Sequence, residues 1–421
     1  MRPYIHTALN IGLAFAMLLA FWRSGLSPHE DAVIYLDSAA DTLRGDGPYV
    51  VINIWREQGY WMGDPRPRPT VEEGPYVYPP VLALVLIPFL ALPRGVATYL
   101  CFLVGFLAVV GTAYLLSRLL GYRNLTAFLA IAALMVYFQP MRRNFWFAQV
   151  DTVVLGLLIL GLALFTARRE VLAGLAIALA VSVKPFAGFV LFYFLWKRSY
   201  RAAAALIVGS GLLVGVPLLA LGLHTVGDYI AGTSWWVGPQ AASTIANQSP
   251  SGMLLRGFTA LNGPPRIAEL PWLVLPLRGA VVLLVGVTLA LLVSRERRLP
   301  GPTVVAEYGL LLLGMIAVSP LGEDLHFVYF AVPLLASAVL CYRAWAADRG
   351  MRLLGLAVLL MYGVFLYPLH TLLERDGPFY ALCALAVVCV LALAYDVRQR
   401  RAGMLPEPGL TDAALMPPAA R

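Results

Sequence analysis

Three side chains in this sequence of 421 residues could carry acid–base or phosphate chemistry: Asp31, Lys184 and His326. Asp31 stands close after Ser27 and Pro28, and a carboxylate at that place could act as a general base towards a hydroxyl group. The same position also suits a helix cap, because acidic side chains are favoured where a helix begins. Spacing alone leaves both interpretations of Asp31 open.

Lys184 and His326 are candidates for binding a phosphate group. Lys184 precedes Pro185 within an apolar run, where proline interrupts a helix and an ammonium group needs an anionic partner. A lipid phosphate would be such a partner, although Lys184 could also pair within the helical bundle and do nothing more. His326 closes a polar turn that contains Glu323 and Asp324. Its ring can donate hydrogen bonds to phosphate oxygens, although a histidine at a helix start is more often structural.

Other polar residues lie near these three or beside apolar runs. Tyr35 falls on the same helical face as Asp31. Six further groups could bind substrate or could simply pair inside a helical bundle: Asn144, Gln149, Asp151, Asn247, Gln248 and Arg256. The sequence has no Walker loop, HExxH zinc motif or GxSxG nucleophile motif. Its four cysteines lack the spacing of a metal site, so none is predicted.

The elements that must position these residues are predicted to be membrane-spanning helices. The sequence is 60% hydrophobic and only 13% charged, and its apolar runs approach the length of about 20 residues that a membrane span needs. About twelve spans are expected, at 5–22, 78–92, 97–117, 125–139, 150–167, 171–195, 202–222, 272–293, 303–318, 327–345, 352–370 and 378–396. No cleavage site follows the first run, which favours a retained helix over a signal peptide.

Basic residues between the runs predict how the helices are oriented. Four breaks rich in Arg or Lys, near residues 197–201, 295–298, 343–352 and 398–401, are predicted to be cytoplasmic. Loops 23–77, 223–271 and 319–326 then lie outside. The net charge of +8 is explained by helix orientation, and no nucleic-acid partner is expected.

One stretch does not fit this orientation. Arg118, Arg123, Arg168 and Arg169 would face outward, whereas Arg142 and Arg143 would face inward. The topology of residues 78–195 is therefore left open, and helices that cross only half of the membrane would resolve the conflict. Residues 1–400 are predicted to form a single transmembrane domain, and residues 401–421 a disordered cytoplasmic tail.

The order of several short motifs resembles glycosyltransferase family 87. These motifs are Asp31-x3-Tyr35, Gly45-x2-Pro48-Tyr49, Tyr78-Pro79-Pro80, Gln149-Val150-Asp151, Lys184-Pro185, Asn247-Gln248-Ser249, and Ser319-Pro320 followed by His326. The resemblance runs from about residue 10 to about residue 345. Ala148 stands where the family usually has glycine.

The resemblance implies an all-α polytopic membrane enzyme of the GT-C fold with interfacial helices in its long first outer loop. It implies transfer of a hexose, mannose above all, from a polyprenyl-phosphate donor to a glycolipid or glycan hydroxyl at the outer face of the plasma membrane. Asp31 would be the inverting general base, and no metal or other cofactor is expected.

The resemblance and the residues together predict a set of side chains that bind the donor phosphate or the substrates: His326, Lys184, Arg256, Tyr35, Gln149, Asn247 and Gln248. Two alternatives stay open from the sequence alone. A transporter or flippase of a lipid-linked sugar would also place charges beside broken helices, and a non-catalytic scaffold would leave Asp31 and His326 far apart.

Overall fold

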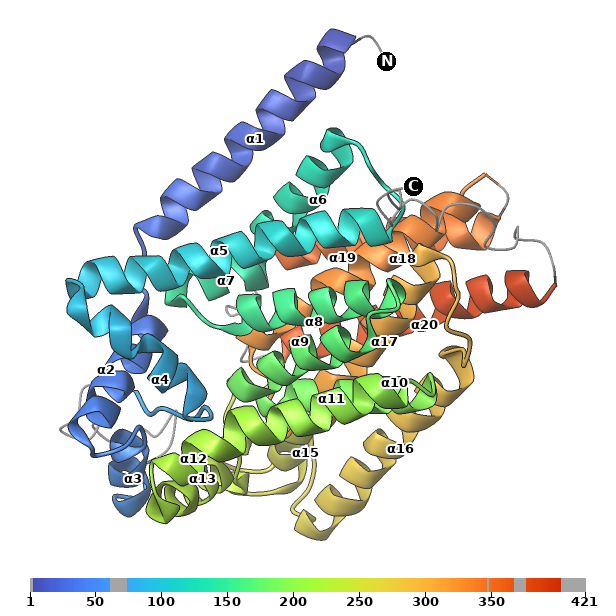
Figure 1. Ribbon diagram of the computed structural model, residues 1–421. Helices are drawn as coiled ribbons and strands as arrows, with labels where there is room; N and C mark the ends of the chain where they lie inside the picture. The colour runs from blue at the N-terminus through green and yellow to red at the C-terminus, as the bar shows by residue number, and fades with distance from the viewer. Residues whose placement is uncertain (1–2, 61–73, 347, 367–375, 403–421) are drawn as a thin grey trace.

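The computed structural model describes residues 3–60, 74–346, 348–366 and 376–402, and every element within these ranges is helical (Figure 1). Eight helices are long and apolar enough to cross a membrane. They are α1 (Pro3–Gly25), α5 (Arg94–Leu119), α11 (Tyr200–Ser210) with α12 (Val216–Ala220), η4 (Pro271–Leu273) with α16 (Val274–Leu292), α17 (Gly301–Val318), η5 (Asp324–Phe330) with α18 (Ala331–Ala344), α19 (Arg349–Leu366) and α20 (Gly377–Arg401). The chain is therefore a multi-pass membrane protein, as the sequence predicts.

The expected number of about twelve spans is not confirmed. Among the described residues there are eight candidate spans, or nine if α6 (Leu125–Tyr137) and α7 (Gln139–Phe147) count as one span bent by 67°. Three predicted runs contain only shorter helices: α4 (Val81–Leu86) with η1 (Ile87–Ala91), α8 (Asp151–Thr166), and α9 (Glu170–Val183) followed by η2 (Pro185–Phe189) and α10 (Val190–Trp196). The predicted disordered tail lies almost wholly outside the described residues.

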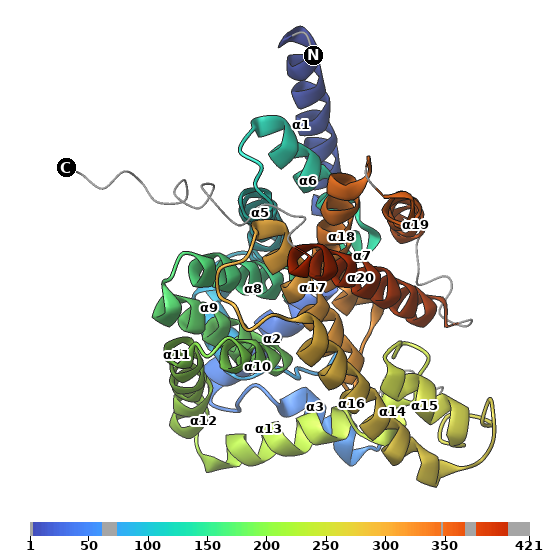
Figure 2. The same ribbon diagram turned by 90° about the vertical axis from the view of Figure 1, so that its right-hand side faces the viewer.

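The ends of several helices meet in a cluster of charged residues, which we call the basic end. Arg297 donates to the carboxylate of Glu170 (2.6 Å) and to the carbonyl oxygen of Lys197 (2.8 Å). The buried ammonium of Lys197 pairs with Glu307 at 2.7 Å. Asp396 pairs with Arg400 and accepts a hydrogen bond from Thr303 at 2.9 Å. The basic end thus joins α9, α10, α17 and α20, whose ends lie towards the right of Figure 1 and face the viewer in Figure 2.

Residues 170–196 form a hairpin rather than a straight span. Arg297 contacts both Glu170, where α9 begins, and Lys197, where α10 has ended, so the chain returns to the basic end that it left. It turns at Lys184, whose backbone is extended because the following Pro185 disfavours a helical conformation. The interruption at Lys184-Pro185 is as predicted.

The hairpin and the short run at 81–91 explain the arginines that the sequence could not orient. Residues 81–91 pack on α2 (Glu30–Arg44) without crossing. Every later loop up to the hairpin therefore lies at the opposite end from the one expected. The carbonyl oxygen of Leu119 lies against Gly301, which puts Arg118 at the basic end, whereas Arg143 pairs with Asp324 at the other end.

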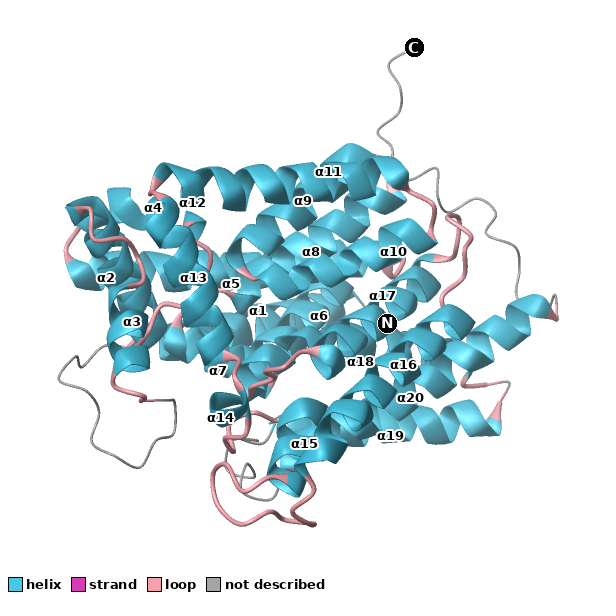
Figure 3. Cartoon of the chain, turned by 90° about the horizontal axis from the view of Figure 1, so that it is seen from below, coloured by secondary structure: helices cyan, strands magenta, loops and turns pink. Residues whose placement is uncertain are grey.

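The remaining helices gather at the end opposite the basic end, where α5 begins. They are α2, α3 (Val50–Glu57), α13 (Leu223–Trp236), α14 (Pro239–Ala242) and α15 (Pro250–Phe258), and Figure 3 shows α2, α3 and α13 together with α4 and α12. The helices expected in the first outer loop are therefore present.

The start of α8 lies deeper in the helical bundle than this end. Gly105 of α5 faces Thr152, and a side chain at Gly105 would clash with it. Gly105 is 11 residues into α5, which is about 16 Å along a helix. Residues next to Thr152 therefore lie about 16 Å from the beginning of α5, measured along that helix.

Candidate active site

Asp31 lies at the beginning of α2 but does not cap it. The N-cap residue is His29, in the left-handed conformation with φ 53°, and no side chain caps the helix. The carboxylate of Asp31 instead accepts a hydrogen bond from Nε2 of Gln149 at 2.5 Å. The capping interpretation of Asp31 is therefore wrong, and its carboxylate faces a side chain 118 residues away.

The amide of Gln149 is held in one orientation by three donors. Its Oε1 accepts from the hydroxyl of Tyr35 (2.6 Å), the hydroxyl of Tyr78 (3.1 Å) and the backbone N–H of Val150 (2.9 Å). Because the oxygen is fixed on this side, the NH2 group must face Asp31. The predicted substrate-binding residues Tyr35 and Gln149 thus lie beside Asp31 and support it.

The environment of Asp31 favours titration near neutrality. Desolvation by burial raises the pKa of Asp31 to about 7, and the negative charges of Asp151 and Glu30 act in the same direction. The positive charge of Lys184 and the hydrogen bond from Gln149 lower this pKa. With a pKa near 7, Asp31 is partly ionised at neutral pH, and an ionised carboxylate can accept a proton.

Lys184 has an acidic partner inside the bundle. Its Nζ donates to Oδ2 of the fully buried Asp151 at 2.7 Å, and the hydroxyl of Tyr329 donates to Oδ1 at 2.7 Å. The partner of Lys184 could have been predicted. Asp151 begins α8, and Lys184 directly follows the end of α9. Because the two helices are antiparallel and have 16 and 14 residues, the start of α8 lies level with the end of α9.

His326 completes this cluster. Its Nε2 lies 3.2 Å from Nζ of Lys184, and its Nδ1 accepts the backbone N–H of Glu323 at 3.1 Å. The Nζ of Lys184 also lies 5.4 Å from the ring centroid of Tyr78, whose hydroxyl reaches Gln149. Asp31, Tyr35, Gln149, Lys184 and His326 therefore belong to one continuous set of contacts.

Arg256, Asn247 and Gln248 lie in a neighbouring cluster. Arg256 pairs with Asp376 at 2.8 Å and donates to two backbone carbonyl oxygens, while Gln248 also contacts Asp376. Asn247 accepts the backbone N–H of Gly322 and donates to a carbonyl oxygen of the same turn. Asn247 thus holds the turn that precedes His326, whereas Arg256 and Gln248 contact Asp376. Substrate contact by the three side chains stays a prediction.

Tyr78 and Glu323 belong to the site although neither was predicted to act there. The Tyr78-Pro79-Pro80 motif has a sufficient structural explanation at a helix start, so no catalytic role is predicted for it. Burial raises the pKa of Glu323 to about 7, against the opposing effect of Lys184. Glu323 is thus a second acid that titrates near neutrality beside Lys184.

The chain matches known membrane glycosyltransferases over most of its length. Residues 76–320 match the model of glycosyltransferase family 87. Two relatives in Mycolicibacterium smegmatis are each 29% identical to the chain. One is named a polyprenol-phosphate-mannose-dependent alpha-(1-2)-phosphatidylinositol pentamannoside mannosyltransferase and aligns over 76% of this chain and 75% of its own length. The other is named the corresponding phosphatidylinositol mannoside mannosyltransferase and aligns over 85% and 86%.

A shorter match covers 32% of the chain at 32% identity and is to an alpha-(1->3)-arabinofuranosyltransferase of Mycobacterium tuberculosis. No solved structure matches the chain significantly. The family match includes Tyr78, Gln149, Asp151 and Lys184. It confirms the predicted resemblance and sets the transporter and scaffold alternatives aside. The chain is a membrane glycosyltransferase and belongs to glycosyltransferase family 87.

Proposed function

We propose that this enzyme transfers mannose from a polyprenyl-phosphate donor to a hydroxyl group of a lipid-linked or glycan acceptor. One observation carries the proposal: the carboxylate of Asp31, oriented by Gln149, belongs to the same cluster as the cationic Lys184 and the imidazole of His326. The names of the two Mycolicibacterium smegmatis relatives support the donor and the sugar.

The proposed reaction is a single displacement. The acceptor hydroxyl gives its proton to the ionised carboxylate of Asp31 as its oxygen attacks the anomeric carbon. The bond from that carbon to the phosphate oxygen breaks, and the electron pair leaves with the polyprenyl phosphate. The new glycosidic bond has the inverted anomeric configuration, and the proton on Asp31 passes to solvent.

Lys184 and His326 suit the leaving phosphate. Nδ1 of His326 accepts a backbone N–H, so the proton of the neutral ring lies on Nε2. The Nε2–H group and the ammonium of Lys184 are both donors and lie 3.2 Å apart, an arrangement that suits a shared anionic oxygen. Their effect grows as negative charge develops on the phosphate, which is the requirement for catalysis.

We further propose that the reaction needs no metal ion, because Lys184 supplies a positive charge at the phosphate and the leaving group needs no protonation. Addition of EDTA to the purified enzyme should leave sugar transfer unchanged. A loss of transfer that Mg²⁺ or Mn²⁺ restores would contradict this part of the proposal.

The outer face of the plasma membrane is the proposed location of the site. Arginine and lysine are retained on the cytoplasmic side of membrane proteins, and the candidate site lies at the end of the bundle opposite the basic end. We propose that the helical bundle has the GT-C fold.

The proposal is tested by mass spectrometry of the products formed from polyprenyl-phospho-mannose and phosphatidylinositol mannosides. Asp31→Asn should abolish transfer, while the protein remains folded, because the amide is similar in size and cannot take the proton. Asp46→Asn, a change of an exposed acid on the same segment, should retain full activity. Wild-type transfer by the Asp31 variant would refute the assigned base, and use of an arabinofuranosyl donor alone would refute the sugar.

A further inference from the structure

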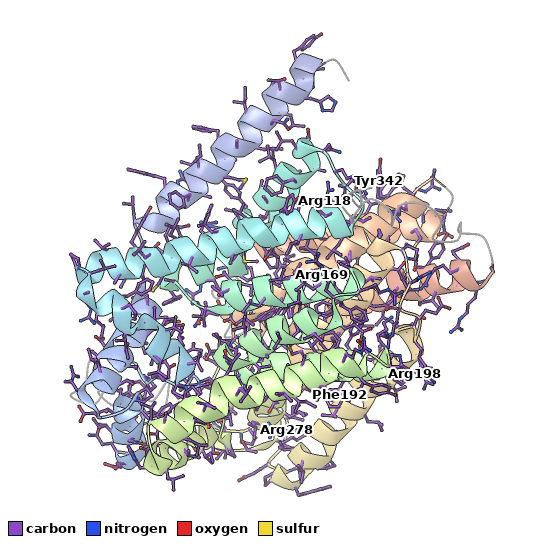
Figure 4. All side chains as sticks on the ribbon, in the orientation of Figure 1. Arg118, Arg169, Phe192, Arg198, Arg278 and Tyr342 are labelled. Carbon is purple, nitrogen blue, oxygen red and sulfur yellow. The ribbon has the colours of Figure 1, made fainter. Side chains whose placement is uncertain are left out.

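A groove on the outer part of the molecule contains an arginine that has no partner among the described residues. The groove has a volume of ≈ 570 Å³ and is formed by α15, the chain that follows it, and the beginning of α16. Its walls are mostly apolar and include Leu255, Val274 and Leu275, and two charged residues, Glu269 and Arg278, also line it. Figure 4 labels Arg278 on the side of α16 that faces α15.

Arg278 stands at an unusual place for a charged residue. It is the only charged residue in the candidate span Pro271–Leu292, which is almost entirely exposed to its surroundings. Arg278 makes no hydrogen bond or ion pair with any residue that the structure describes, Glu269 included. An arginine in a lipid-facing helix normally pairs with an anion or reaches the headgroup region.

Arg278 lies close enough to the start of its span for its side chain to reach a lipid phosphate. The span begins at Pro271 on the side opposite the basic end, and Arg278 is seven residues further, about 10 Å along the helix. An arginine side chain can extend back towards the headgroups over several ångströms. Trp272, six residues before Arg278, is 69% exposed, as is typical of the membrane interface.

We infer that this groove binds the phosphodiester headgroup of a phospholipid in the outer leaflet. The guanidinium of Arg278 would hold the phosphate with two parallel hydrogen bonds. The carboxylate of Glu269 would accept hydrogen bonds from hydroxyl groups of the headgroup, and the acyl chains would lie along the exposed side chain of Leu275. A headgroup that offers both a phosphate and hydroxyl donors matches this pair of charges better than a choline headgroup, which has no donor.

The phosphodiester can come from two sources. It can belong to a bulk phospholipid, or to the lipid acceptor of the reaction, and the second source rests on the proposed function. α15 connects the groove with the site: its C-terminal part lines the groove, and Asn247, just before its N-cap, is bonded to Gly322 near His326. α15 has nine residues and is about 13 Å long, which a lipid-linked glycan could bridge.

Lipid binding is tested with the full-length protein by native mass spectrometry after incubation with phosphatidylinositol or phosphatidylcholine. Arg278→Gln should lower retention of phosphatidylinositol about tenfold, which corresponds to the loss of a charge-assisted hydrogen bond. Arg278→Lys should retain part of the binding, because it keeps the charge without the bidentate geometry. Arg201→Gln, an exposed arginine at the basic end, is the matched control and should bind as the wild type does.

Equal retention by Arg278→Gln and wild type, or an equal loss in Arg201→Gln, would overturn the inference. Thermal unfolding of each variant checks that the fold is retained. A raised KM for a phosphatidylinositol mannoside acceptor with unchanged kcat would identify the acceptor as the occupant, whereas binding loss with unchanged kinetics would identify a bulk lipid. Because lipid retention is measured without sugar transfer, failure of this inference is distinguishable from failure of the proposed function.

Discussion

At the scale of single residues, the site depends on side chains that orient one another. The side-chain amide of Gln149 has one orientation, because two tyrosine hydroxyls and a backbone N–H donate hydrogen bonds to its oxygen. Its remaining donor therefore stabilises the ionised form of Asp31, which must be ionised to act as a base. Burial acts against that ionisation, so small changes around Asp31 should be visible in the pH dependence.

Gln149→Leu should lower kcat roughly tenfold or more and move the acidic limb of the pH–rate profile to higher pH, because loss of the hydrogen bond raises the pKa of Asp31. In the wild type, activity should rise with pH through about 7 as Asp31 ionises. The profile is measured under saturating donor. Gln58→Leu, an exposed change on α3's C-cap, should leave the limb in place, and an unchanged limb in Gln149→Leu would argue against a positioning role.

The buried pair of Lys184 and Asp151 separates structural from catalytic effects. Lys184→Met leaves a buried carboxylate unpaired and should destabilise the protein by about 3 kcal/mol. The double variant Lys184→Met, Asp151→Asn removes both charges and should recover much of the thermal stability. Sugar transfer should stay lost in both variants, and in Lys184→Ala the weakened step should be use of the donor. Recovery of activity together with stability would show that Lys184 only supports the fold.

At the scale of elements, the turn after α7 aims Gln149 at the site. α7 ends at Ala148, which has φ 52°, a conformation that glycine adopts without strain and other residues rarely adopt. The left-handed turn brings Gln149 round so that its backbone N–H donates to the carbonyl oxygen of Asn144. The direction of Gln149 is therefore set by a strained residue at the helix end.

Ala148→Gly should stabilise the protein by about 1 kcal/mol, because the left-handed conformation costs an L-residue about that much. Ala148→Val should destabilise it, since branching at Cβ crowds the same turn further. Thermal unfolding in detergent measures both. If the glycine variant unfolded at a lower temperature than the wild type, relief of backbone strain would not be the dominant effect.

The sequence predicts which segments are helical better than it predicts which helices cross the membrane. Apolar runs indicate helices reliably, and Lys184-Pro185 marks the break, because proline acts locally on the backbone. Run length did not reveal that 81–91 stays at one end or that 170–196 folds back, because these outcomes depend on packing between helices. Likewise, Asp31 could be singled out as a potential base. Gln149 was also among the predicted binding residues, but its hydrogen bond to Asp31 could not be predicted, because 118 residues separate the two.

At the scale of the whole molecule, charge is distributed between two ends with different composition. The basic end carries the paired charges of Lys197, Glu307, Arg297 and Glu170, and the other end carries the candidate site. The sequence could not orient Arg118 and Arg123, whereas the packing of Leu119 on Gly301 assigns them to the basic end.

Single cysteines in a background without the four native ones test this arrangement in intact cells. Arg123→Cys and Arg298→Cys should be protected from a membrane-impermeant maleimide, because both residues lie at the end proposed to be cytoplasmic. Asp46→Cys, exposed after α2, should be labelled. Labelling of Arg123→Cys from outside would instead support the topology that simple counting of apolar runs predicts.

The depth of the candidate site has an energetic consequence for a lipid-linked substrate. Asp151 begins α8 next to Thr152, about 16 Å along α5 from its start, so the candidate site lies well within the thickness of the bundle. Lifting one isoprene unit of five carbons from the bilayer into water would cost about 4 kcal/mol. An enzyme that lowers its reacting groups towards the lipid avoids this cost, because the isoprenoid can stay among the acyl chains while its phosphate reacts.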